Sequence, residues 1–148
     1  MGHPEIFSIY LERYNELKSK VDGRDIAALA DTREGLRLLY NLAYAALGVG
    51  TLFLRLGAII QVAWYMQERF TNDPDPIVNR TIVNSMRDKA ITYGEWQRIW
   101  DSLRTTTTAS SNRVIRELGG VPSDKLKRFV EIRNTIVHPR KEGIQAEE

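Results

Sequence analysis

The residues of this chain best suited to acid–base chemistry lie close together near its C-terminus. Arg133, Asn134 and His138 fall within residues 131–139. Histidine titrates near neutral pH and can both take and give a proton, as attack of a ribose 2′-hydroxyl on its adjacent phosphate requires. Arginine offers a planar, permanently charged group that matches phosphate oxygens and the charge that grows on them. Together these residue types could cleave a phosphodiester without a metal ion or another cofactor.

The spacing of Arg133 and His138 limits how the two side chains can meet. Five residues of α-helix turn through about 500°, so the two side chains are displaced by about 140° round the helix axis. A regular helix therefore cannot hold both in one tight site. Another element or another chain has to bring them together.

Positive charge collects around the same segment. The net charge of the whole chain is only +2, which by itself is too small to predict binding to nucleic acid. Residues 123–141, however, hold six basic and two acidic residues, a local excess of four. We expect Lys125, Arg128, Arg140 and Lys141 to contact the phosphates of a substrate. The alternative is that these cations only solvate the outer face of the last helix.

The order of these residues resembles a family motif. Arg133, the polar Asn134 that follows it and His138, placed in the last helix of a small helical protein, resemble the R-x4-6-H motif of the HEPN (higher eukaryotes and prokaryotes nucleotide-binding) superfamily. The match covers six residues strictly and the helical architecture loosely.

The resemblance implies a metal-independent endoribonuclease with a toxin or defence role. The family dimerises, with motifs from two subunits facing a shared cleft, so a homodimer that acts on RNA is implied here. An antitoxin or a nucleotidyltransferase is the further partner that the resemblance suggests. Members regulated by a nucleotidyltransferase often have a tyrosine two residues after the histidine. This chain has Arg140 there, which counts against that modification.

The resemblance also implies a role for each residue of the motif. Two alternatives to these catalytic roles stay open. His138 is the expected general acid and base, Arg133 the group that binds the scissile phosphate, and Asn134 the residue that orients either. In the first alternative, Arg133 and Asn134 are exposed helix residues and His138 is a C-terminal cap stabilised by the helix dipole. In the second, the chain is a catalytically inactive HEPN-like module that dimerises and binds a nucleotide or a protein.

Composition predicts a folded, all-α protein. The chain has 148 residues, the usual size of one domain, and 43% of them are hydrophobic and 27% charged. It has no cysteine and no secretory pattern at its N-terminus, which favours a cytoplasmic location and excludes thiolate metal sites. We expect one bundle of about four to six helices over residues 1–139, followed by a disordered charged tail over residues 140–148.

The element that must organise this bundle is a long apolar helix. Only two charged residues occur between Leu36 and Met66. Apolar residues recur there in steps of four and three, which defines a heptad seam. The heptad seam consists of Leu38, Leu42, Ala45, Val49, Leu52, Leu56, Ile59, Ala63 and Met66. A second column of Leu39, Ala46, Phe53 and Ile60 widens the apolar face to that of the central helix of a bundle.

Two features of this helix leave alternatives. Gly48, Gly50 and Gly57 either allow another backbone to approach closely, in a tight packing or subunit contact, or break the helix. A run of 17 uncharged residues, 38–54, reaches the lower limit of a membrane span. Asn41 lies inside this run and Arg55 ends it, so we expect burial in a soluble bundle and no membrane association.

Local patterns predict the other boundaries. Helical periodicity over residues 5–21 stops near Gly23, and two prolines place a loop at residues 71–76. Thr92 and Glu95 predict a capping box, and Ser123 a cap for the last helix. Residues 105–111 are either a mobile connector or a helix weakened by β-branched side chains. Trp96 and Trp100, one turn apart, are expected in the core rather than stacked on bases.

Overall fold

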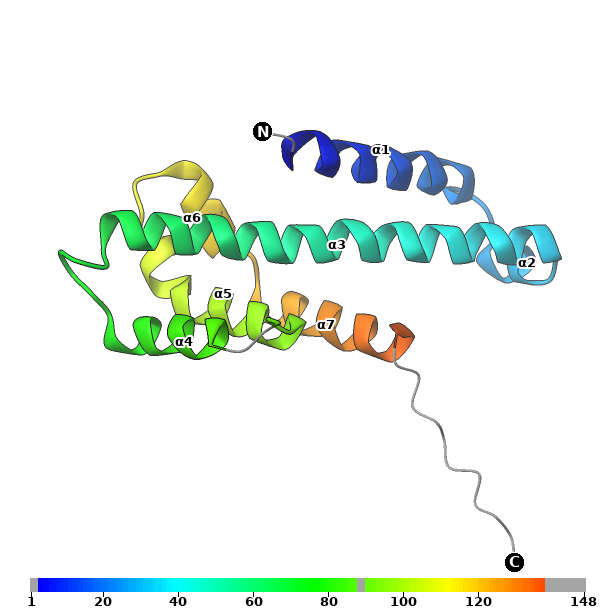
Figure 1. Ribbon diagram of the computed structural model, residues 1–148. Helices are drawn as coiled ribbons and strands as arrows, with labels where there is room; N and C mark the ends of the chain where they lie inside the picture. The colour runs from blue at the N-terminus through cyan, green and yellow to red at the C-terminus, as the bar shows by residue number, and fades with distance from the viewer. Residues whose placement is uncertain (1–2, 88–89, 138–148) are drawn as a thin grey trace, which may run out of the picture. The chain divides into compact units, whose positions relative to one another are not determined.

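Helices account for all the regular structure in the part of the chain that the computed structural model describes, residues 3–87 and 90–137. The elements are α1 (His3–Val21), α2 (Ile26–Ala30), α3 (Arg33–Glu68), α4 (Pro76–Met86), α5 (Tyr93–Thr108), α6 (Arg113–Gly119) and α7 (Ser123–Val137) (Figure 1). The all-α class and the single long apolar helix are therefore confirmed. Two of these helices, α2 and α6, are short, with 5 and 7 residues.

The chain divides into two compact units, Met1–Phe53 and Leu54–Glu148. Helix α3 begins in the first unit and ends in the second. The single bundle expected over residues 1–139 stays a prediction, and the tail expected over residues 140–148 lies outside the described residues.

The first unit starts its helices with side-chain caps. The Asp25 carboxylate accepts a hydrogen bond from the Ala27 backbone N–H at 2.9 Å and so caps α2. The Thr32 hydroxyl oxygen accepts one from the Gly35 N–H at 3.0 Å at the start of α3. Between α1 and α2, Gly23 has a φ of 76°, a conformation that glycine adopts without strain and that ends α1 as predicted.

Close approach of other atoms explains two of the three glycines of α3 in this unit, Gly35 and Gly48. A Cβ atom added to Gly48 would lie 3.1 Å from the Tyr10 ring, so this side chain of α1 lies close against this position of α3. The buried apolar side chains of the unit are Leu17, Val21 and Leu29.

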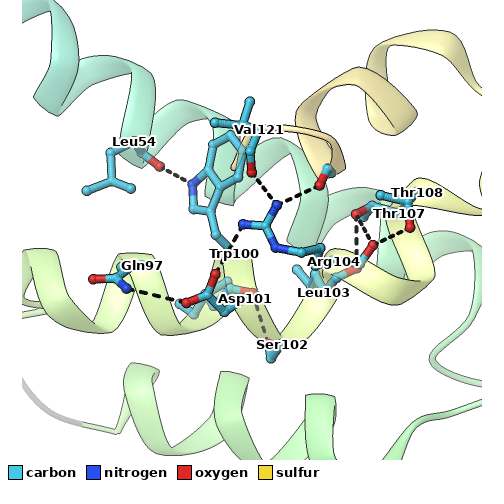
Figure 2. A network of polar contacts seen from close by, with 12 residues as sticks. Leu54, Gln97, Trp100, Asp101, Ser102, Leu103, Arg104, Thr107, Thr108 and Val121 are labelled. Atoms are coloured by element: carbon cyan, nitrogen blue, oxygen red, sulfur yellow. Dashed lines mark hydrogen bonds and ion pairs between the residues drawn. The ribbon is translucent and has the colours of Figure 1, made fainter. Parts of the chain in front are cut away.

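The second unit is built round Trp100 of α5. Its indole N–H donates a hydrogen bond to the backbone carbonyl oxygen of Leu54 at 2.8 Å (Figure 2). A Cβ atom added to Gly57 would lie 2.2 Å from the indole ring, so only glycine leaves room for it there. Gly57 is thus a packing position and not a helix break. The core round Trp100 includes Leu54, Ala58, Tyr65, Val78, Ile82, Trp96, Ile99, Leu103, Leu126 and Val130.

In this unit the heptad seam is not the buried face of α3, contrary to its expected place in the core. Ile59 and Met66 of the seam are 47% and 44% exposed, whereas the fully buried residues are Leu54, Ala58, Gln61 and Tyr65. The buried set lies about 150° round the helix axis from the seam. The physical reason is shape, because the broad indole of Trp100 packs against the gap that Gly57 leaves.

Helix α3 also meets the length and composition of a membrane span. Its most apolar 18-residue window has a mean hydropathy of 1.7, and 28% of that window is buried.

The predicted loop and capping box are both present. Asp75 accepts hydrogen bonds from the Ile77 and Val78 N–H groups and begins α4 after the loop at residues 71–76. Thr92 and Glu95 form a capping box at the start of α5, in which the Thr92 N–H donates to Glu95 Oε2 at 2.6 Å. This hydrogen bond lowers the pKa of the Glu95 carboxyl.

Two further boundaries were predicted less well. Of the two alternatives for residues 105–111, the helical one applies as far as Thr108, and Thr107 is buried with its hydroxyl donating to the Leu103 carbonyl oxygen at 2.9 Å. Ser123 is the first residue of α7 rather than its cap, since the Leu126 N–H donates to the Pro122 carbonyl oxygen at 3.3 Å.

Candidate active site

Helix α7 packs on the second unit through one apolar face. Leu126 and Val130 are buried, and Phe129 is partly buried against the same core. Arg133 follows Val130 by three residues and therefore continues this core-facing side. Its side chain is half-buried, while the neighbouring Asn134 is exposed.

Two neighbours hold the Arg133 side chain. Its guanidinium carbon lies 4.0 Å from the centroid of the Tyr93 ring, within the range of a cation–π interaction. Its Nη1 donates a hydrogen bond to Asn134 Oδ1 at 3.1 Å. The side chains of two of the three predicted catalytic residues, which are neighbours in the sequence, are therefore hydrogen-bonded to each other.

This arrangement leaves Arg133 able to bind an anion. A guanidinium carries five N–H donors, and among the described residues only one of its hydrogen bonds, to Asn134, is seen. Stacking on an aromatic ring fixes the plane of the group while its edges stay available for oxygen atoms. Arg133 is therefore a positioned cation that can meet a phosphate.

Tyr93 is a site residue that sequence reasoning missed. It is the first residue of α5, directly after the capping residue Thr92. The capping box fixes this end of the helix and with it the start of the Tyr93 backbone. The sequence contained that local pattern, but the contact with a residue forty positions later depends on tertiary packing.

The third predicted catalytic residue cannot be placed relative to Arg133. Helix α7 ends at Val137, and His138, Arg140 and Lys141 lie outside the described residues. The proximity of Arg133 and His138 stays a prediction, as does the alternative in which His138 caps the helix.

The remaining predicted substrate-binding residues are exposed on α7. Lys125 and Arg128 both face solvent. Arg128 precedes Arg133 by five residues, about 140° round the helix axis, so it does not share the face of Arg133. It lines a shallow pocket of about 240 Å³ together with Glu131, Ile132, Thr135 and Ile136. The carboxylate of Glu131 makes that pocket a poor phosphate site.

A different cavity adjoins Tyr93. It measures about 280 Å³ and is lined by Arg55, Ala90, Ile91, Tyr93 and Trp96. Trp96 belongs to the core, as predicted, but it also borders this cavity. Arg55, which the sequence marked only as the end of an uncharged run, supplies the single positive charge of the lining.

A network of hydrogen bonds holds the segment between α6 and α7 against α5. Arg104 of α5 donates hydrogen bonds to the carbonyl oxygens of Gly119, at 2.9 Å, and of Val121, and it pairs with Asp101 at 3.1 Å (Figure 2). A Cβ atom at Gly119 would lie 2.3 Å from Thr107 Oγ1, so the chain passes close to α5 there. These contacts set where α7 begins, and through it the position of Arg133.

Neither a family model, nor a curated protein, nor a solved structure matches this chain in the comparisons made. Within the described ranges, no group of three or more acidic or histidine side chains is placed to hold a metal ion.

Proposed function

We propose that this chain is a metal-independent endoribonuclease of the HEPN type, with a toxin or defence role and no cofactor. The observation that supports the proposal most is the state of Arg133. A cation that only solvates a helix extends into water, whereas Arg133 is half-buried, lies 4.0 Å from the Tyr93 ring centroid and is hydrogen-bonded to Asn134. Such pre-positioning suits a group that stabilises charge in a transition state.

The proposed reaction uses the two ends of the motif. His138 takes the proton of the ribose 2′-hydroxyl, and the 2′-oxygen attacks the adjacent phosphorus. The bond from phosphorus to the 5′-oxygen breaks, and that oxygen receives a proton from a second imidazole or from water. Arg133 neutralises the charge on the non-bridging oxygens. The products are a 2′,3′-cyclic phosphate and a 5′-hydroxyl.

We propose a homodimer, because one regular helix cannot bring Arg133 and His138 together. The second unit offers a surface for a second copy, which we call the seam face: Ile59, Ile60, Ala63 and Met66 of α3, all exposed. The four residues of the seam face are uncharged, and the nearest charge on this side of α3 is Arg55, one turn before Ile59. Exposed apolar patches of this kind commonly mark interfaces.

The other partners belong to the same proposal. RNA is the substrate, and the cytoplasm is the compartment in which this protein would meet it. An antitoxin or a nucleotidyltransferase is the proposed regulator. The second candidate function is a catalytically inactive dimerisation module, which the exposed seam face favours independently of Arg133.

Cleavage of RNA in excess EDTA tests the enzyme directly. Purified protein is incubated with structured and unstructured RNA beside Arg133→Ala and His138→Ala. Arg113→Ala is the matched control, because this arginine on α6 is 82% exposed and pairs only with Glu117 among the described residues. We expect cleavage with cyclic phosphate ends by the wild type and by the control, and none by the two site variants. No cleavage of any RNA, or equal cleavage by all four proteins, would favour the inactive module.

A further inference from the structure

Arg55 is an arginine without an evident structural role. It is the only charged residue of α3 between Arg37 and Glu68. No ion pair or hydrogen bond of its guanidinium to another described residue is found, and its side chain is exposed at the cavity beside Tyr93. An arginine whose charge stabilises nothing else in the fold is available for an anion from outside it.

The cavity has the size and lining of a site for one nucleotide. Its volume of about 280 Å³ lies just below the usual range of ligand pockets, about 300 to 1,000 Å³. Its walls combine one cation with two aromatic side chains, Tyr93 and Trp96. Proteins that bind single-stranded nucleic acid combine these same groups, using cations for the phosphates and aromatic rings for the bases.

Tyr93 connects this cavity to the candidate active site. The Arg133 guanidinium lies over the ring of Tyr93, and the same residue lines the cavity that holds Arg55. All these residues belong to the second unit. Tyr93 is thus common to the Arg133 contact and to the cavity that Arg55 lines.

We propose that Arg55, Tyr93 and Trp96 form a subsite for one nucleotide of single-stranded RNA, next to the phosphate bound by Arg133. Arg55 binds the phosphate of that nucleotide, and its base contacts Tyr93 and the edge of Trp96. The subsite rests on the proposed ribonuclease function for the identity of its ligand. It adds a substrate-binding residue, Arg55, that lies outside the C-terminal motif.

RNA binding by the full chain carrying His138→Ala tests this subsite without cleavage. The probe is a fluorescently labelled single-stranded RNA, and the dissociation constant is measured by anisotropy over a series of salt concentrations. Arg55→Ala is compared with Arg37→Ala, the same substitution at an exposed arginine of the same helix. Circular dichroism confirms that both variants keep the helical content of the parent.

We expect Arg55→Ala to weaken RNA binding roughly tenfold. The slope of log affinity against log salt should also become shallower by about 0.7, because neutralising one phosphate of a single strand contributes a slope of about that size. Arg37→Ala should change neither quantity. Tyr93→Leu should weaken binding at an unchanged slope, and Tyr93→Phe, which keeps the ring, should bind as the parent does.

The outcomes separate this inference from the proposed function. A lower affinity and a shallower salt slope with Arg55→Ala support the subsite even if the wild type cleaves no RNA. In that case only the ribonuclease proposal fails. If the Arg55→Ala and Arg37→Ala variants bind RNA with the same affinity and the same salt slope, the subsite is overturned. Absence of any RNA binding by the parent overturns it as well.

Discussion

At the scale of single residues, Arg133 is a charged side chain held in place before any substrate arrives. Its guanidinium carbon lies 4.0 Å from the centroid of the Tyr93 ring, and its Nη1 donates a hydrogen bond to Asn134. Ordering a free arginine on binding would lose side-chain entropy, so a group already held in place binds its ligand more tightly. The same contacts would also stabilise the last turn of α7, which is why Arg133→Ala needs a stability measurement beside its activity.

Gln61 is a buried residue whose side-chain amide is only partly hydrogen-bonded within the described residues. It is fully buried, its Nε2 donates to the Gly57 carbonyl oxygen at 3.1 Å, and its Oε1 has no partner in the part of the chain that the structure describes. A buried acceptor without a donor is destabilising by about 1–3 kcal/mol. We predict that Gln61→Leu raises the melting temperature by a few degrees, measured by thermal circular dichroism. Gln61→Ala, which leaves a cavity, should lower it, and a fall with both variants would refute the prediction.

At the scale of elements, local patterns defined most of the helix ends. The capping box at Thr92, the loop at residues 71–76 and the stop at Gly23 were predictable because each depends on neighbours in sequence. The buried face of α3 was not, because that helix is apolar on nearly every side. Periodicity then cannot choose a face, and the choice was made by the Trp100 indole, which lies at Gly57.

The residues of the candidate site also differ in whether the sequence alone predicts them. Arg133 and Asn134 could be found from their residue types and spacing, because both lie on one helix. Tyr93 and Arg55 could not, since only folding places Tyr93 of α5 against Arg133 of α7 and gives Tyr93 and Arg55 of α3 a common cavity.

Arg104 joins α5 to the segment that leads into α7. We predict that Arg104→Ala lowers the free energy of unfolding by about 2–4 kcal/mol, because it leaves the Gly119 and Val121 carbonyl oxygens without their charged donor. Denaturant unfolding measures this. Arg113→Ala removes an exposed ion pair and should lower it by less than about 1 kcal/mol. Equal losses in the two variants would mean that the Arg104 network does not hold α7.

The capping box makes the start of α5 sensitive to acid. The hydrogen bond from the Thr92 N–H lowers the pKa of Glu95 from its ordinary value of 4.5. A carboxyl with a lowered pKa in the folded state stabilises the fold above pH 4.5, and this stabilisation is lost as the pH falls through the folded value. We predict that Glu95→Gln, which keeps an acceptor without a charge, loses less stability between pH 7 and pH 3 than the wild type does in thermal melts. A parallel decline of both proteins would contradict this assignment.

At the scale of the whole molecule, the proposed active site needs a second copy of the chain. The exposed Ile59 of the seam face is the position at which a new charge would oppose association and leave the core intact. We predict that Ile59→Glu shifts the protein from dimer to monomer in sedimentation and lowers RNA cleavage with it. Ile77→Glu is the matched control, because this isoleucine of α4 is 74% exposed and lies outside the seam face. A monomeric wild type, or binding of the wild type to lipid vesicles through α3, would contradict the dimer.

The most direct test of the central claim is RNA cleavage in EDTA by a heterodimer of Arg133→Ala and His138→Ala chains. The two chains are co-expressed with different tags, and the mixed dimer is purified through both. If Arg133 of one subunit acts with His138 of the other, the mixed dimer keeps one intact site of two and should cleave at about half the wild-type rate. Each parental homodimer should be inactive. A mixed dimer as inactive as its parents, beside an active wild type, would show that no site is shared between subunits.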